Sequence, residues 1–382
     1  MGQVRNQITT VLKKIFTLTI YITFFTNVIN SENNVVNQSK PLEIGASYTG
    51  DLVSNFVGGI KTGTTYLGLI NVAADFDTQQ ANWWNGGEFF VNIANTHGGT
   101  PSANLVGDFQ GISNIEAGNL TFLYELWYKQ NIGQFEFTLG LQDLNANFAT
   151  NENGAIFTNS SFGIHSSLAD NISTPIFPLT ALGINAKWDI SDEFTWQAAI
   201  FDGTPDDFEN NPFNVNWKLS KEQGFLVATE FQYLNSLLKN RTGNYKLGIY
   251  FHEHNDYTNA QQENGGLYFV GEQQVTENFY LFSQIGFSPK SKNTHNQFYS
   301  LGLNCKKVFE KRPNDEFGLA IAYAGIDGNN VGSETAIELL YLFSFSSHFY
   351  LKPDLEYIIN PAGTNVKLPN ALVGSIRVGL NF

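Results

Sequence analysis

Two stretches near the end of the chain decide the fold: HFYLKPDLEY at His348–Tyr357 and LVGSIRVGLNF at Leu372–Phe382. In the second stretch, even-numbered positions carry large apolar side chains such as Ile376, whereas odd-numbered positions carry Ser375 and Arg377. The first stretch separates its apolar and charged residues in the same way. Alternation with a period of two predicts two β-strands, each with one apolar and one charged face.

The same alternation continues along the chain from Leu42, in short segments separated by turns rich in Gly, Asn, Asp, Pro and Ser. Strands are predicted near residues 42–51, 65–75, 86–96, 121–131, 135–143, 181–189, 193–202, 224–234, 243–251, 266–272, 278–287, 296–305, 316–324, 335–344, 347–357 and 372–382. Connections after odd-numbered strands are longer than those after even-numbered strands. This pattern predicts an all-β fold, a transmembrane antiparallel β-barrel of about 16 strands with long outer loops and short periplasmic turns. A soluble β-sandwich with a lectin-like function is the alternative.

Composition narrows the possible functions. Charged residues make up 15% of the 382 residues, against about 25% in an average soluble domain, while aromatic residues make up 14%. The net charge of −14 would repel phosphodiester backbones, so no nucleic-acid partner is expected. A single Cys and the absence of a phosphate-binding Gly motif predict no disulfide, no metal site and no cofactor.

The N-terminal 31 residues are typical of a secretory signal peptide. Arg5, Lys13 and Lys14 precede an apolar segment at Ile15–Ile29, which is shorter than the roughly 20 apolar residues of a spanning helix. We therefore predict a signal peptide at 1–31, a flexible mature N-terminus at 32–41 and a single barrel domain at 42–382.

The charged strand faces are predicted to line a water-filled lumen, because a charge that faces hydrocarbon costs about 2–4 kcal/mol near the bilayer midplane. On strand 121–131, we predict that Phe122, Tyr124 and Leu126 face outward. The predicted lumen residues with the strongest binding potential are Glu125, Trp127, Lys129, Asp354, Glu356 and Arg377. Because Arg377 would face a water-filled lumen, its replacement by Gln is expected to leave folding intact. The faces of strands 65–75 and 278–287 alternate poorly and are not assigned.

The chain also resembles the carbohydrate-selective porin family of the bacterial outer membrane, often called the OprB family. The resemblance covers Leu42–Phe382 and includes the stretches ELWYKQ at 125–130, FTNSSFG at 157–163, IFDGTPD at 200–206 and LKPDLEYIINPAG at 351–363. It implies a barrel in the outer membrane of a Gram-negative bacterium that passes sugars passively and is not an enzyme. It also implies that the final aromatic, Phe382, is recognised by the outer-membrane assembly machinery. At Gln142 the family often has a basic residue, so this chain departs from the pattern there.

General porins fold their third outer loop into the barrel, and the corresponding segment here is Leu144–Thr180. It is the longest connection, and long loops without regular structure are usually functional. We predict that Phe157, Phe162 and His165 of this loop join the lumen residues at the constriction, where rings cover a sugar face and polar groups meet its hydroxyls. A general or ion-selective porin is the alternative function. The sequence does not determine the preferred sugar or whether the protein is a monomer or a homotrimer in the lipid bilayer. A barrel hydrolase would need a group of Ser, His and acidic side chains on the outer wall or rim, and the sequence does not predict such a group there.

Overall fold

The computed structural model describes residues 40–382 apart from 236, 239, 256–257, 259, 327–331 and 364–366. The predicted signal peptide and most of the predicted flexible N-terminus lie outside the described residues. Residues Pro41–Phe382 form one compact unit. In the part of this unit that is described, no helix is long and apolar enough to cross a membrane.

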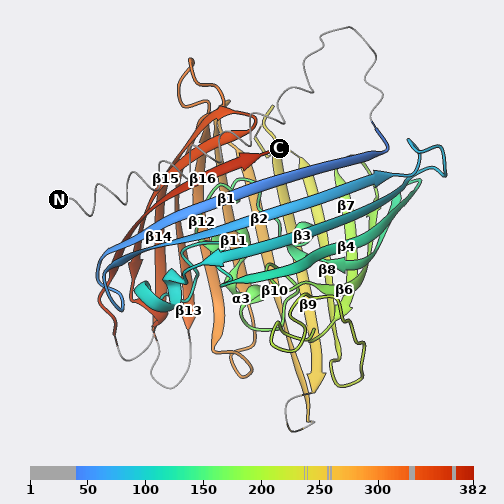
Figure 1. Ribbon diagram of the computed structural model, residues 1–382, viewed down its shortest axis with the longest axis horizontal. Coiled ribbons are helices and arrows are strands. Elements are labelled where there is room, and N and C mark those ends of the chain that lie inside the picture. Colours follow the sequence, from blue (N-terminus) through green and yellow to red (C-terminus); the bar gives the residue numbers. More distant parts are fainter. Residues whose placement is uncertain are drawn as a thin grey trace, which may run out of the picture. The chain divides into compact units, whose positions relative to one another are not determined.

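The strands form one closed antiparallel barrel in which each strand pairs with its neighbours in sequence and β1 pairs with β16. Figure 1 shows β1 in blue and β16 in red side by side at the point of closure. The strands are β1 (Leu42–Val57), β2 (Gly63–Asp77), β3 (Gly87–Gly98), β4 (Leu120–Ile132), β5 (Phe135–Gln142), β6 (Ala181–Asp189), β7 (Phe194–Asp202), β8 (Phe225–Asn235), β9 (Gly243–Asn255), β10 (Gln261–Gln274), β11 (Phe279–Phe287), β12 (His295–Lys306), β13 (Glu316–Ile326), β14 (Ser333–Ser346), β15 (Phe349–Ile359) and β16 (Ala371–Asn381). The predicted antiparallel barrel of sixteen strands is confirmed.

The alternation of side chains places apolar residues outside and charged residues inside. On β16, Ile376 is 47% exposed whereas its neighbour Arg377 is 6% exposed. The paired strand β15 repeats this arrangement, with Leu355 exposed and Asp354 buried. Because side chains alternate across a strand, the exposed apolar residues form the outward surface of the barrel and the charged ones face its interior.

On β4, the alternation changes at a bulge, and the prediction that Phe122 and Tyr124 face outward is wrong. The register with β3 shifts so that Glu125 lies opposite Asn92 while Leu123 lies opposite Ile93, which leaves Tyr124 without a partner on β3. An extra residue of this kind reverses the faces of the residues that follow it. Phe122 is consequently 1% exposed and faces the interior, whereas Leu126 faces outward as predicted.

The two strands that alternate poorly in sequence carry apolar residues on their inward faces. On β2, Leu67 faces inward and packs in a cluster with Ile112 and Ile115 of the connection 99–119. On β11, Phe282 faces inward and packs against Phe157 of the connection 143–180. Inward apolar residues therefore mark the places where a loop packs against the wall from inside.

Loop lengths follow the predicted odd–even pattern only in part. Three long connections, 99–119, 143–180 and 203–224, all follow odd-numbered strands and lie at one end of the barrel, called here the loop end. The connection 58–62, which also follows an odd-numbered strand, is shorter than the turn 78–86 that follows an even-numbered one. The reason is that β1 extends six residues beyond its predicted end, which shortens the loop that follows it.

Candidate functional site

The interior of the barrel is narrowed by the connection 143–180, here called the constriction loop. It leaves β5 at Asp143, whose side chain accepts a hydrogen bond from the Asn145 amide at the start of a short 3₁₀ turn, η2 (Leu144–Ala146). Two further helical turns follow, α2 (Ser160–Gly163) and α3 (Ser166–Ala169). Figure 1 shows α3 within the outline of the barrel, near β10.

Buried carboxylates on the barrel wall hold the backbone of the constriction loop. Each accepts hydrogen bonds from amides of the loop: Glu230 from Ala149 at 2.8 Å, Glu272 from Asn153 at 2.8 Å, and Glu338 from Thr158 at 2.6 Å and Asn159 at 3.0 Å. Bonds to charged groups contribute about 1.5–3 kcal/mol each. Because all three carboxylates are at most 5% exposed, the loop amides also replace the water that these charges lack.

Wall donors hold the loop carbonyls in the same way. Lys246 Nζ donates to the Thr150 carbonyl at 2.6 Å, Lys352 Nζ to the Ile156 carbonyl at 2.6 Å, and Gln284 Nε2 to the Phe162 carbonyl at 2.6 Å. These donors come from β9, β15 and β11, so the loop is attached on several sides of the barrel. The constriction loop is therefore a fixed part of the interior.

The three loop side chains that were predicted at the constriction are all buried against the wall. The Phe157 and Phe162 rings lie 4.9 Å apart and contact Phe282 of β11. His165 packs on Tyr268 of β10, and burial, with His295 beside it, lowers its pKa to about 3. With exposures of 1% or less, these side chains attach the loop rather than line the lumen, which differs from their predicted placement.

The predicted wall residues Asp354, Glu356 and Arg377 are also buried. Glu356 accepts a hydrogen bond from the Asn159 side chain of the constriction loop at 2.9 Å. Arg377 donates through Nε and Nη2 to both carboxylate oxygens of Asp51, each at 2.7 Å, and through Nη2 to Asn114 at 2.8 Å. The fork that was expected to bind sugar hydroxyls is thus already paired inside the protein.

Three predicted residues on β4 remain half-exposed inside the barrel: Glu125, Trp127 and Lys129. The Trp127 ring stacks on Phe90 with centroids 4.9 Å apart, and its Nε1 donates to Glu125 at 3.3 Å. Lys129 pairs with Glu88 at 2.6 Å and lies 5.2 Å from the Trp127 ring. A ring edged by a carboxylate and an ammonium group can meet both the apolar face and the hydroxyls of a solute.

A second inward loop, residues 99–119, was not predicted to take part in the site. Glu334 of β14 accepts hydrogen bonds from the amides of Phe109 at 2.7 Å and Gln110 at 2.9 Å. The loop then contacts the constriction loop directly, because the Ser160 amide donates to the Gly111 carbonyl at 2.8 Å. The inward apolar positions of β2 were the sequence signal that could have revealed this packing.

Comparison with known proteins identifies the family. The family described as carbohydrate-selective porin, OprB family, matches residues 61–382. The chain belongs to this family. It is 23% identical to Porin B of Pseudomonas aeruginosa, with 90% of this chain and 88% of the relative covered, and 22% identical to the putative porin QuiX of Acinetobacter baylyi, with 88% of each covered. The high-pH structure of OprB from Pseudomonas putida superimposes with a TM-score of 0.80 at 21% identity, covering 90% of this chain and 94% of that one.

This carbohydrate-selective porin is a sugar channel of the Gram-negative outer membrane, and its outward surface suits that location. Aromatic pairs lie on the outward side near the turn end, the end opposite the loop end. Phe135 stacks on Trp188 at 5.6 Å, and Phe194 on Tyr233 at 4.7 Å. Such rings are typical of the boundary between lipid and water.

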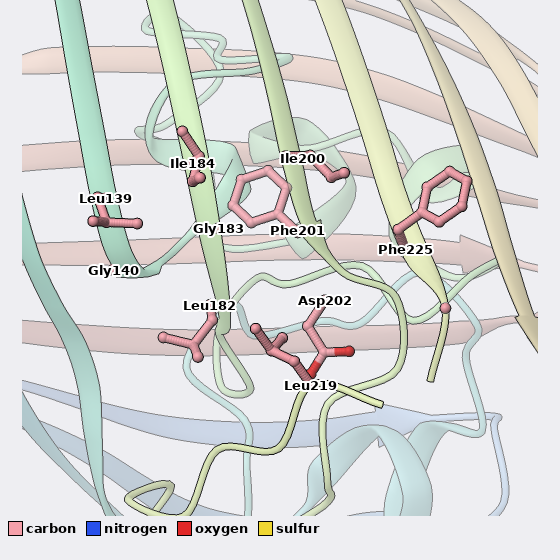
Figure 2. A pocket seen from close by; sticks show the side chains of 11 residues that line it. Leu139, Gly140, Leu182, Gly183, Ile184, Ile200, Phe201, Asp202, Leu219 and Phe225 are labelled. Atoms are coloured by element: carbon pink, nitrogen blue, oxygen red, sulfur yellow. The ribbon is translucent and has the colours of Figure 1, made fainter. Parts of the chain in front are cut away.

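The outward surface of this porin also carries an apolar recess of about 300 Å³ across β5–β8. Figure 2 shows Leu139, Ile184 and Ile200 on neighbouring strands of this recess, with Leu219 of the connection 203–224 near the ends of β6 and β7. Leu139 and Ile184 are exposed and on the outward face. The recess therefore belongs to the lipid-facing surface and not to the path of the sugar.

Proposed function

We propose that sugars cross this porin by passive, weakly selective diffusion past the constriction loop, without any catalytic step, and that Glu125, Trp127 and Lys129 contact them. The observation that carries the proposal is that these side chains stay half-exposed in the interior, while wall carboxylates such as Glu272 and Glu338 are buried and bonded to the backbone of the constriction loop. Weak contacts with a ring and with polar groups replace part of the hydration of a sugar and still allow its release.

The test compares Trp127→Ala with Trp188→Ala in planar bilayers and in liposome-swelling assays. Trp188 faces outward on β6, so its replacement changes an aromatic residue without touching the lumen. Wild-type protein is expected to pass sugars and to show a reduced ion current when sugar is added. Trp127→Ala should weaken that reduction, whereas Trp188→Ala should preserve it. Equal sugar effects in the two variants would remove Trp127 from the path.

Phe382 and the lipid-facing surface are the proposed contacts of this porin with the assembly machinery and with neighbouring copies. The Phe382 amide donates to the Ala46 carbonyl at 2.8 Å, while 66% of the residue stays exposed, which leaves the ring available to the assembly machinery. Deletion of Phe382 is expected to lower the yield of assembled barrel in the outer membrane. A homotrimer embedded in outer-membrane lipid stays a prediction, and native mass spectrometry of the detergent-extracted protein would decide it.

A further inference from the structure

The two inward loops line an open cavity of about 330 Å³. None of the residues discussed above as sugar contacts lines it. Its walls come from residues 109–111 of one loop and from residues 160–179 of the constriction loop. The cavity therefore lies at the contact between the two loops, inside the barrel. Its volume is at the lower end of the range of roughly 300–1,000 Å³ for small-molecule sites, which favours a single sugar ring over a longer chain.

The cavity combines rings with hydrogen-bond acceptors. Phe109 and Phe177 line it, and both are fixed by other rings: Phe109 lies edge-on to His295 at 5.2 Å, and Phe177 lies 5.8 Å from Tyr124. Asp170 lines the same cavity, its carboxylate has no hydrogen bond or ion pair with any described residue, and burial raises the pKa of this carboxyl group to about 7. Rings of this kind can cover the C–H face of a pyranose while an unpaired carboxylate accepts its hydroxyl protons.

Thr174 adds a second acceptor to Asp170. The hydroxyl of Thr174 already donates to the Leu168 carbonyl at 2.6 Å, so toward a ligand it can only accept. Gln110 also lines the cavity, but its Oε1 is buried away from the cavity space and its Nε2 donates to Glu334, so it supplies no acceptor to a ligand there. No Lys, Arg or His is among the residues that line the cavity. Carboxylated sugars would find no positive charge there, and above pH 7 they would be repelled by the ionised Asp170.

We infer that this cavity, here called the acceptor cradle, is a binding subsite for one ring of an uncharged sugar and that Asp170 makes it discriminate against sugar acids. The inference rests on the proposed passage of sugars and adds the substrate class to it. A hydroxyl that donates to a carboxylate makes a charge-assisted hydrogen bond, which is roughly twice as strong as a neutral one. Loss of the charge should weaken binding roughly threefold to tenfold, since tenfold in affinity corresponds to about 1.4 kcal/mol.

The experiment measures the reduction of single-channel current by glucose and by glucuronate in planar bilayers at pH 8, where Asp170 is ionised. The variants are Asp170→Asn and Phe177→Ala, and the control is Asp192→Asn, which removes the same charge from an exposed turn between β6 and β7. Asp170→Asn is expected to weaken the effect of glucose and to raise the effect of glucuronate relative to glucose. Phe177→Ala should weaken the effects of both solutes, and Asp192→Asn should behave like wild type. Mobility of unheated samples on gels confirms that each barrel is folded.

The outcomes separate this inference from the proposed function. If wild-type protein neither passes sugars nor responds to glucose, the proposed passage itself fails. If wild-type protein responds to glucose while Asp170→Asn keeps both the glucose effect and the glucose-to-glucuronate ratio unchanged, the sugar channel stands and the acceptor cradle is overturned. A change in the ratio for Asp192→Asn equal to that for Asp170→Asn would also overturn it, because the effect would then come from net charge alone.

Discussion

Glu272 on β10 offers a selective way to loosen the constriction loop. Its Oε1 accepts hydrogen bonds from Asn153 of the loop, from the backbone amide at 2.8 Å and from Nδ2 at 2.7 Å. Both donors belong to the loop, so Glu272→Ala removes a loop attachment and leaves the hydrogen bonds between strands intact. At about 1.5–3 kcal/mol for each bond to a charged group, the local docking of the loop loses about 3–6 kcal/mol.

A loss of that size should raise the population of a locally open loop at least about a hundredfold, because about 1.4 kcal/mol corresponds to a factor of ten. The other attachments, at Glu230, Glu338, Lys246 and Lys352, keep the rest of the loop in place. The expected result is faster cleavage near residues 148–157 by chymotrypsin and more frequent high-conductance openings in single-channel records. Glu272→Gln retains one acceptor and should lie between the alanine variant and wild type.

Glu263→Ala is the matched control, since Glu263 lies on the same strand and its side chain is exposed. If Glu272→Ala and Glu263→Ala are cleaved at the same rate and conduct identically, the constriction loop is not held by the buried wall carboxylates. Barrel assembly, followed by the mobility of unheated samples on gels, should be normal in both variants. A failure of Glu272→Ala to assemble would show instead that the loop attachment is required for the barrel itself.

Three further predictions concern the wall and the second loop. Arg377→Gln, which the sequence alone suggested would leave folding intact, should destabilise the barrel by about 3–5 kcal/mol, because the fully buried Asp51 loses its charged partner and keeps only the Ser113 hydroxyl; the double variant with Asp51→Asn should recover part of the loss in urea unfolding. Ile376→Lys should lower assembly into lipid vesicles, because a charge on the lipid face costs about 2–4 kcal/mol near the midplane, whereas Ile376→Leu should assemble normally. Burial raises the pKa of Asp108 from 3.8 to about 6 and that of Glu116 from 4.5 to about 7, so their contribution to loop stability is fully present below about pH 4 and is lost as the pH rises from there through 6 to 7. Proteolysis within residues 99–119 should therefore be slower at pH 5.5 than at pH 8, and an equal rate at both values would contradict this assignment.

The strands could be predicted from the sequence because each one needs only local information. A residue such as Ile376 next to Arg377 fixes both the strand and its faces. The bulge at Tyr124 could not be predicted, since alternation within β4 is unbroken in sequence and the shift exists only relative to β3. The ion pair of Arg377 could not be predicted for the same reason, because Asp51 becomes its neighbour only when β1 pairs with β16.

The site was harder to predict than the fold because charged interior residues have two possible kinds of partner. The groups that would meet sugar hydroxyls, carboxylates and ammonium groups, are also the groups that satisfy backbone amides and carbonyls. Glu338 and Lys352 lie inside the barrel and yet bind the constriction loop, with little exposure left for a solute. Glu125 and Asp170 differ from them because part of each residue stays exposed. Which interior charges can bind sugar is therefore decided by the path of the loops, and that path is indicated in the sequence by the apolar inward positions of β2 and β11, such as Leu67 and Phe282, where alternation fails.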